Sequence, residues 1–193
     1  MKNILLFSVC LLMMFSFQSM AQEGEQMDPQ MKAWMEYMTP GDMHKMLEKS
    51  NGTWNTKVTM WMAPGTEPMM SEGTTVNEMI FGGRYQKSSH SGDMMGMPME
   101  GMNLLAFDNA TEKFQSVWID NMGTGMMLAE GKYDEATKKV DMNGTYVDPM
   151  DGTKKPFRQT FEVVDENTQV FEMFLNDEKG SEFKTMHIEY KRQ

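Results

Sequence analysis

Residues 52–62 read Gly-Thr-Trp-Asn-Thr-Lys-Val-Thr-Met-Trp-Met, and this stretch decides the fold. Val58, Met60 and Met62 recur at every second position, which is the period of a β-strand with one face buried. The same period returns at residues 114–119 and 183–190. Turn-forming sequences separate such runs at residues 63–65, 82–83, 108–109, 121–123, 148–149, 165–167 and 177–180. We count about ten strands with short connections and no long helix between them, which predicts an all-β antiparallel meander, sandwich or barrel.

The same alternation sorts the side chains of each strand by face. In the last strand it places four side chains together on one face: Lys184, Met186, Ile188 and Tyr190. In the strand before it, Phe171, Met173 and Leu175 share a face opposite to Glu172 and its neighbours. Both faces of these strands are mixed, which favours a barrel with a partly polar lumen over a solid apolar core.

Residues 28–50 have helical spacing instead. Met31, Trp34, Met35 and Met38 are spaced as one face of a helix. The sequence Thr39-Pro40-Gly41-Asp42 predicts a second short helix, with Thr39 as its N-cap. Three roles stay open for the methionine face of this segment: it plugs the barrel, it mediates a homodimer, or it rests on another partner.

The first 21 residues have the pattern of a secretory signal peptide. Lys2 precedes an apolar run at residues 4–17, and a small-x-small cleavage site ends at Ala21. We expect cleavage after Ala21, a disordered mature N-terminus at residues 22–27, a helical segment at 28–50 and a barrel domain at 51–193. The mature protein is then exported, either periplasmic or extracellular, with no membrane span, since the apolar run is shorter than the roughly 20 residues that cross a bilayer.

Charge and cysteine content exclude several classes of protein. The chain has 18 Lys and Arg against 28 Asp and Glu, for a net charge of -10, so nucleic acid is not expected as a partner. The single cysteine, Cys10, lies inside the predicted signal peptide. A disulfide scaffold and thiol chemistry are therefore excluded for the mature chain.

Several motifs, in order and at characteristic spacing, carry a family resemblance. They lie at residues 52–54, 81–85, 97–101, 107–109, 118–124, 131–134, 148–149 and 188–192. Over about residues 45 to 192 the chain resembles the secreted bacterial family catalogued as domain of unknown function 1579. The resemblance implies a lipocalin-like (calycin-type) antiparallel barrel outside the cytoplasm, closed at one end by Trp54, and supplies no activity. Arg192 is a candidate to stack on Trp54. The chain departs from the family pattern at His187, where an acidic residue is expected, and at Ala106, where glycine is expected.

A catalytic site is not favoured. The chain offers only His44, His90 and His187 as general bases, and it has no G-x-S-x-G, H-E-x-x-H or phosphate-binding glycine loop. Asp120 could be a buried acid, but its place at a strand end is more typical of a turn former. We therefore predict no catalytic residues and no cofactor, and an uncharacterised enzyme ranks third among the functions considered.

The preferred function is binding of a hydrophobic or amphipathic small molecule in the barrel lumen. Arg84 and Arg158 are the candidates to fix a head group, unless each pairs with a carboxylate such as Glu172. The full set of predicted ligand-binding residues is Arg84, Tyr85, Trp118, Asp120, Arg158, Glu172 and His187.

The alternative function is binding of a soft metal ion, Cu(I) or Ag(I). The chain has 27 methionines, and thioethers are ligands that such ions select. The candidate ligands within segment 90–102 are His90, Met94, Met95, Met97 and Met99. The competing interpretation is that these methionines only line a loop and the core, because methionine fills irregular apolar space readily.

Overall fold

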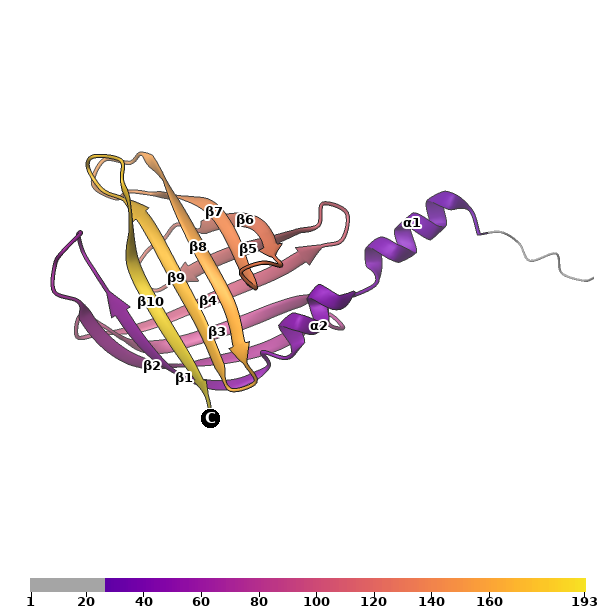
Figure 1. Ribbon diagram of the computed structural model, residues 1–193, viewed down its shortest axis with the longest axis horizontal. Helices are drawn as coiled ribbons and strands as arrows, with labels where there is room; N and C mark the ends of the chain where they lie inside the picture. The colour runs from indigo at the N-terminus through magenta and orange to yellow at the C-terminus, as the bar shows by residue number, and fades with distance from the viewer. Residues whose placement is uncertain (1–26) are drawn as a thin grey trace, which may run out of the picture.

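The computed structural model describes residues 27–193, which form a closed barrel of ten antiparallel strands preceded by two helices (Figure 1). The predicted signal peptide and residues 22–26 lie outside the described residues. The elements are α1 (Pro29–Met38), α2 (Asp42–Glu48), β1 (Gly52–Met60), β2 (Met69–Ile80), β3 (Tyr85–Met94), β4 (Met97–Asp108), β5 (Lys113–Asp120), β6 (Met127–Asp134), β7 (Lys139–Val147), β8 (Lys154–Asp165), β9 (Thr168–Asn176) and β10 (Glu182–Arg192).

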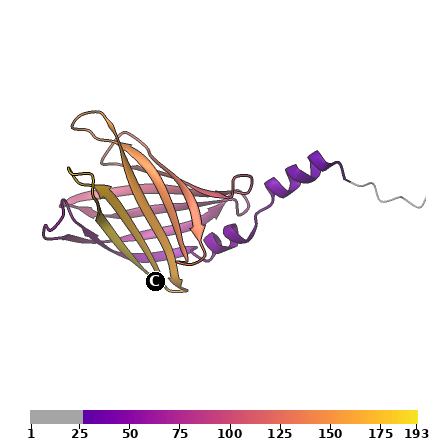
Figure 2. The same ribbon diagram turned by 45° about the horizontal axis from the view of Figure 1, so that its top comes forward.

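Each strand pairs with its neighbour in the chain, and β1 pairs with β10 to close the sheet. Figure 2 shows the strands wrapping around one axis, tilted against it. Closure leaves no strand with unpaired backbone groups along its edge. The predicted fold class, an antiparallel barrel after a short helical segment, is confirmed. None of the helices in the described part of the chain is long and apolar enough to cross a membrane.

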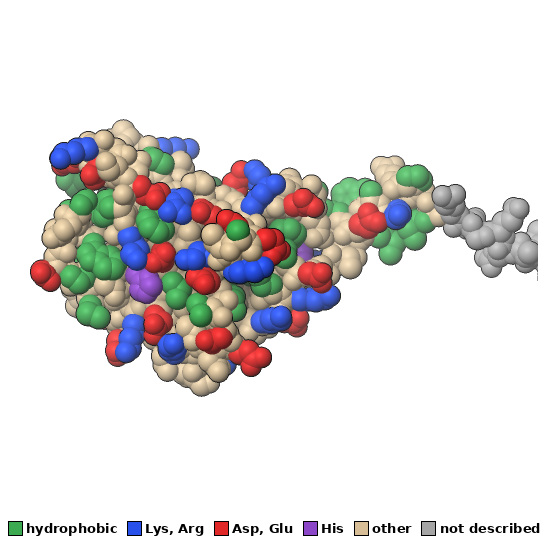
Figure 3. Space-filling model, viewed as in Figure 1, with side chains coloured by type: hydrophobic (Ala, Val, Ile, Leu, Met, Phe, Trp, Pro, Cys, Tyr) green, Lys and Arg blue, Asp and Glu red, His purple; other side chains and the backbone are tan. Residues whose placement is uncertain are grey.

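The two helices differ in how they meet the barrel. α1 projects away from it, and none of its residues is buried (Figures 1 and 3). α2 covers one end of the barrel, where Leu47 has no exposed surface. Gln86 of β3 donates a hydrogen bond to the Leu47 carbonyl at 2.7 Å, which fixes α2 in place. Of the two helices, α2 therefore plugs the barrel and α1 does not.

The predicted N-cap of α2 is wrong. Gly41 occupies that position, and its backbone N–H donates to Nδ1 of His44 at 3.0 Å. Thr39 instead ends α1, and its hydroxyl donates to the Met35 carbonyl at 2.6 Å. The imidazole of His44, and not the Thr39 hydroxyl, therefore caps the start of α2.

The end covered by α2 is the closed end of the barrel. Trp54 is fully buried there, and its indole N–H donates to the Ser50 carbonyl at 2.9 Å. The Arg192 guanidinium lies 4.2 Å from the centroid of the Trp54 ring, so Arg192 stacks on Trp54 as expected. The apolar core continues inward from Leu47 and comprises Leu105, Phe114, Ala129, Val140, Met142 and Phe157.

One strand face differs from the prediction. Met186, Ile188 and Tyr190 line the interior, but the β9–β10 register shifts between Lys184 and Met186. This bulge turns Lys184 to the outer face, because one extra residue reverses the alternation of side chains along a strand.

Candidate functional site

The barrel encloses a cavity of about 280 Å³ that runs from the closed end to the opposite, open end. Its size lies near the lower limit of small-molecule pockets, which measure about 300–1,000 Å³. Toward the closed end the wall combines apolar core residues with uncharged polar side chains, of which these are buried: Thr56, Thr75, Asn77, Gln86, Ser88, Ser116 and Gln169. Toward the open end the wall is rich in methionine, including Met60, Met94, Met99 and Met127. The buried polar groups therefore lie toward the closed end, beside an apolar lining that continues to the open end.

Two buried atoms of the polar wall have no hydrogen-bond partner among the described residues. Oδ1 of Asn77 is an unpaired acceptor and Nε2 of Gln169 is an unpaired donor, and both side chains line the cavity. The amide nitrogen of Asn77 is engaged, since it donates to the Ser50 carbonyl at 3.1 Å. Such orphaned groups are rare in folded proteins and call for a ligand or ordered water.

His90, Trp118 and Asp120 form a connected group on β3 and β5. Nδ1 of His90 and the Thr75 hydroxyl are 2.8 Å apart. The His90 and Trp118 rings meet edge to face, with centroids 5.1 Å apart. The indole N–H of Trp118 donates to one Asp120 oxygen at 2.5 Å, and the backbone N–H of Met122 donates to the other at 2.9 Å. Asp120 is therefore both a turn former and the anchor of a cavity-wall tryptophan.

Burial keeps His90 neutral. It lowers the pKa of the imidazole from 6.5 to about 4, because transfer out of water penalises the charged form. At neutral pH the ring thus presents one donor and one acceptor, and Thr75 uses one of them.

Gly101 on β4 provides the space that Trp118 needs. A Cβ atom at this position would overlap the six-membered part of the Trp118 ring. The two residues lie on neighbouring strands, where Gly101 opposes Asp120. The flat indole therefore lies across the β4 backbone, a placement that only glycine permits here.

The charge inside the cavity is of one sign. The charged residues at its wall are Glu72, Asp93 and Asp120, of which Glu72 and Asp93 are exposed and have side chains on the outer face by strand alternation. None of the lysines or arginines in residues 27–193 lines the cavity. An anionic head group would meet only carboxylates and neutral groups in this cavity.

Comparison with known proteins places this barrel in a family. Residues 39–192 match the family described as "Protein of unknown function (DUF1579)". The chain belongs to the DUF1579 family. The match confirms the resemblance carried by the sequence motifs and extends it to all of α2.

The fold of this DUF1579 protein also occurs in a solved structure. The chain is similar to the one titled "Crystal Structure of Rv2717c from M. tuberculosis", with a TM-score of 0.59 and 12% sequence identity. The alignment covers 80% of this chain and 99% of that chain. At this identity the likeness supports the fold alone. No curated protein matches the chain.

Two of the predicted ligand-binding residues of the DUF1579 protein lie outside the lumen at the closed end. Arg84, in the β2–β3 turn, donates to the Met38 carbonyl at 2.7 Å and so anchors the end of α1. Tyr85 is 38% exposed and packs edge to face against Phe81. Neither side chain lines the cavity.

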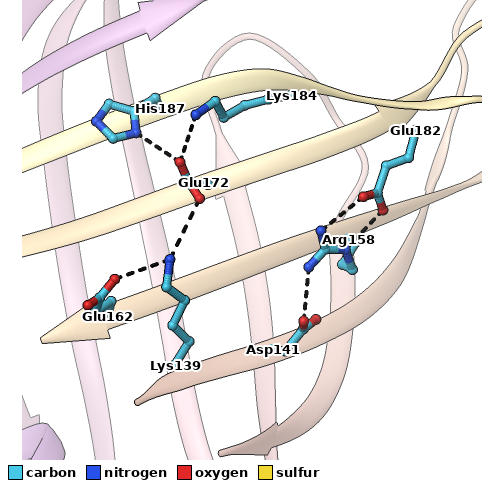
Figure 4. A network of polar contacts seen from close by, with 8 residues as sticks. All are labelled: Lys139, Asp141, Arg158, Glu162, Glu172, Glu182, Lys184 and His187. Atoms are coloured by element: carbon cyan, nitrogen blue, oxygen red, sulfur yellow. Dashed lines mark hydrogen bonds and ion pairs between the residues drawn. The ribbon is translucent and has the colours of Figure 1, made fainter. Parts of the chain in front are cut away.

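Three more of these residues lie on the outer face of β8–β10, in two ion-pair groups (Figure 4). Arg158 forms ion pairs with Glu182 and Asp141, each at 2.9 Å. Both contacts raise the pKa of Arg158, and the hydrogen bond to Glu182 contributes most. His187 meets Glu172 at 3.2 Å, and Lys184 meets the same carboxylate at 2.8 Å. Arg158 therefore pairs with carboxylates, although its partners are not Glu172. Of the seven predicted residues, the lumen holds Trp118 and Asp120.

The predicted metal ligands of the DUF1579 protein are divided between two environments. His90, Met94 and Met99 line the cavity, whereas Met95 and Met97 are 57% and 51% exposed. Residues 27–193 contain no group of three or more His, Cys, Asp or Glu side chains arranged to hold a metal ion.

The polar wall of the cavity was not predicted from the sequence. Asn77, Gln86 and Gln169 were not singled out, although each belongs to a strand with two mixed faces. The mixed faces signalled a polar lumen in general. They did not distinguish the polar side chains that turn inward from those that face water.

Proposed function

We propose that this protein is a non-enzymatic binder of a small hydrophobic or amphipathic molecule, held in the barrel cavity. The observation that carries the proposal is the pair of unpartnered buried groups in the cavity wall, Asn77 Oδ1 and Gln169 Nε2. Leaving one such group unpaired costs about 1–3 kcal/mol. A ligand that donates one hydrogen bond to Asn77 Oδ1 and accepts one from Gln169 Nε2 removes this cost.

The chemistry of the wall supports a neutral head group. The buried end of the cavity offers hydroxyls and amides, and the charged residues around the cavity, Glu72, Asp93 and Asp120, are carboxylates nearer the open end. A fatty-acid carboxylate would find no cation there. A primary amide or an alcohol would satisfy Asn77 and Gln169, with its apolar part lying toward the methionines, whose flexible side chains adapt to different shapes.

The test begins with native mass spectrometry of the mature protein purified from its own compartment. A retained organic mass supports the proposal. Titration then uses a matched series of ligands that share one alkyl chain and end in a primary amide, an alcohol or a carboxylate. Binding is monitored by the fluorescence of Trp118. We expect the amide to bind at least about tenfold more tightly than the carboxylate, which corresponds to about 1.4 kcal/mol.

Matched variants separate the cavity from the surface. Gln169→Met should weaken amide binding and leave binding of the alkyl chain intact, whereas Gln115→Met, at an exposed position on β5, should change neither. If all members of the series bind equally, the head-group assignment is wrong and the binding function stands. If no mass is retained and no member binds, the binding function itself is wrong.

We also propose that the protein acts outside the cytoplasm. The support is the signal-peptide pattern of residues 1–21, with its cleavage site at Ala21. Fractionation of the producing cell and N-terminal sequencing test this proposal. A mature chain that begins at Gln22 in an extracytoplasmic fraction supports it, and an uncleaved chain in the cytoplasm overturns it.

A further inference from the structure

Methionines gather at the open end of the barrel. Four of the five connections at this end contain methionine: residues 61–68, 95–96, 121–126 and 148–153, but not 177–181. None of the four connections between described strands at the closed end contains one: residues 81–84, 109–112, 135–138 and 166–167. Core packing does not explain this asymmetry, because loop methionines such as Met62 and Met150 are 64% and 90% exposed.

Inside this open end, four methionines form one continuous row across neighbouring strands. Met60 of β1 lies directly opposite Met69 of β2 on one side and Met186 of β10 on the other. Met186 in turn lies opposite Met173 of β9. Directly opposed residues share a face and have Cβ atoms about 5 Å apart. Met60, Met173 and Met186 line the cavity, and Met69, directly opposite Met60, shares their face at the rim.

The row is accessible from solvent. Met69 is 36% exposed and lies at the first position of β2, while Met60, Met173 and Met186 are only partly buried. The bulge between Lys184 and Met186 lies just beyond the row. It turns Lys184, which strict alternation would place on the same face as Met186, to the outer face.

We propose that Met60, Met69, Met173 and Met186 form a thioether site for one soft monovalent cation, Cu(I) or Ag(I). Thioether sulfur is a soft, neutral ligand that selects such ions. Each methionine has three rotatable side-chain bonds, which lets sulfur atoms on neighbouring strands converge on one ion. This site differs from segment 90–102, the metal site considered as the alternative function, whose candidate ligands are divided between the cavity and the surface.

The charge of the cavity suits a cation. Asp120 lines it, Glu72 and Asp93 lie at its border, and no lysine or arginine from the described residues lines it. These carboxylates raise the local concentration of positive ions. Thioethers carry no proton at any ordinary pH, so binding requires no deprotonation. Affinity should therefore change little between pH 7 and pH 5, in contrast to a histidine or cysteine site.

The test titrates the mature protein with Ag(I), a redox-stable probe. Binding is measured by native mass spectrometry and by NMR of methionine methyl groups labelled with ¹³C. We expect one tightly bound Ag(I), with shifts confined to the methyl resonances of the four row methionines. Met60→Leu/Met186→Leu should lower the affinity for Ag(I) at least tenfold, because leucine conserves volume but removes sulfur. Met69→Leu/Met173→Leu serves as a second variant if the first does not fold.

The control is Met62→Leu/Met150→Leu, which removes two exposed loop thioethers and should leave the affinity unchanged. Equal Ag(I) affinity in the row variant and the wild type overturns the site. So does an equal loss in the control, or the absence of stoichiometric Ag(I) from the wild type. These outcomes do not depend on the organic ligand, because the alkyl series reports on that function separately.

Discussion

Acid should destabilise this barrel through His90, which burial keeps neutral. The pKa of His90 is about 4 in the folded protein against 6.5 in the unfolded chain. Between these values the unfolded state binds more protons than the folded state, so the free energy of unfolding falls as pH falls. The stabilising contribution is complete above pH 6.5 and lost at about pH 4. This difference corresponds to about 3 kcal/mol.

The assay is urea denaturation of the mature protein at pH 7, 6, 5 and 4, in the wild type and in His90→Gln. Glutamine keeps a hydrogen-bonding group near Thr75 but does not titrate. The wild type should lose about 3 kcal/mol more than the variant over this range. His44, whose pKa burial also lowers, is present in both proteins, so its contribution cancels. Identical pH dependence in the two proteins would refute the reasoning that His90 is buried as a neutral base.

Three further predictions concern the closed end and the cavity wall. Leu47→Ala, at a side chain with no exposed surface, should lower the free energy of unfolding by about 2–5 kcal/mol; a loss under about 1 kcal/mol in urea denaturation would show that α2 does not seal the barrel. Arg192 donates to three backbone carbonyls and stacks on Trp54, so Arg192→Gln should cost about 1–3 kcal/mol. Arg192→Lys should not restore this stability, and full recovery in the same assay would contradict the stacked geometry. Gly101→Ala should displace the Trp118 ring and alter near-ultraviolet circular dichroism while far-ultraviolet dichroism is kept; an unchanged near-ultraviolet spectrum would count against the close approach.

The barrel itself could be predicted from local sequence. Alternating runs between short turns indicate antiparallel strands because strand side chains repeat every second residue. The helical spacing of residues 31–38 likewise indicated α1. The family motifs then added what spacing could not, the place of Trp54 at the closed end of the barrel.

The candidate site was predicted only in part. Trp118 and Asp120 do line the lumen, whereas Arg84 and Arg158 do not. An arginine beside an aromatic residue in a strand fits either face, and its partners decide which one it takes. The partners of Arg158 are Asp141 on the preceding strand, β7, and Glu182 at the start of β10.

The sequence by itself thus determined the strands, their antiparallel order and the family, because these depend on contacts within a strand or between neighbours in the chain. Only the tertiary structure decided which face of each strand turns inward, since alternation separates two faces without assigning either to the lumen. It also revealed the row of Met69, Met60, Met186 and Met173. That row requires β1 to pair with β10, the two ends of the barrel sheet, and no local sequence period indicates this pairing.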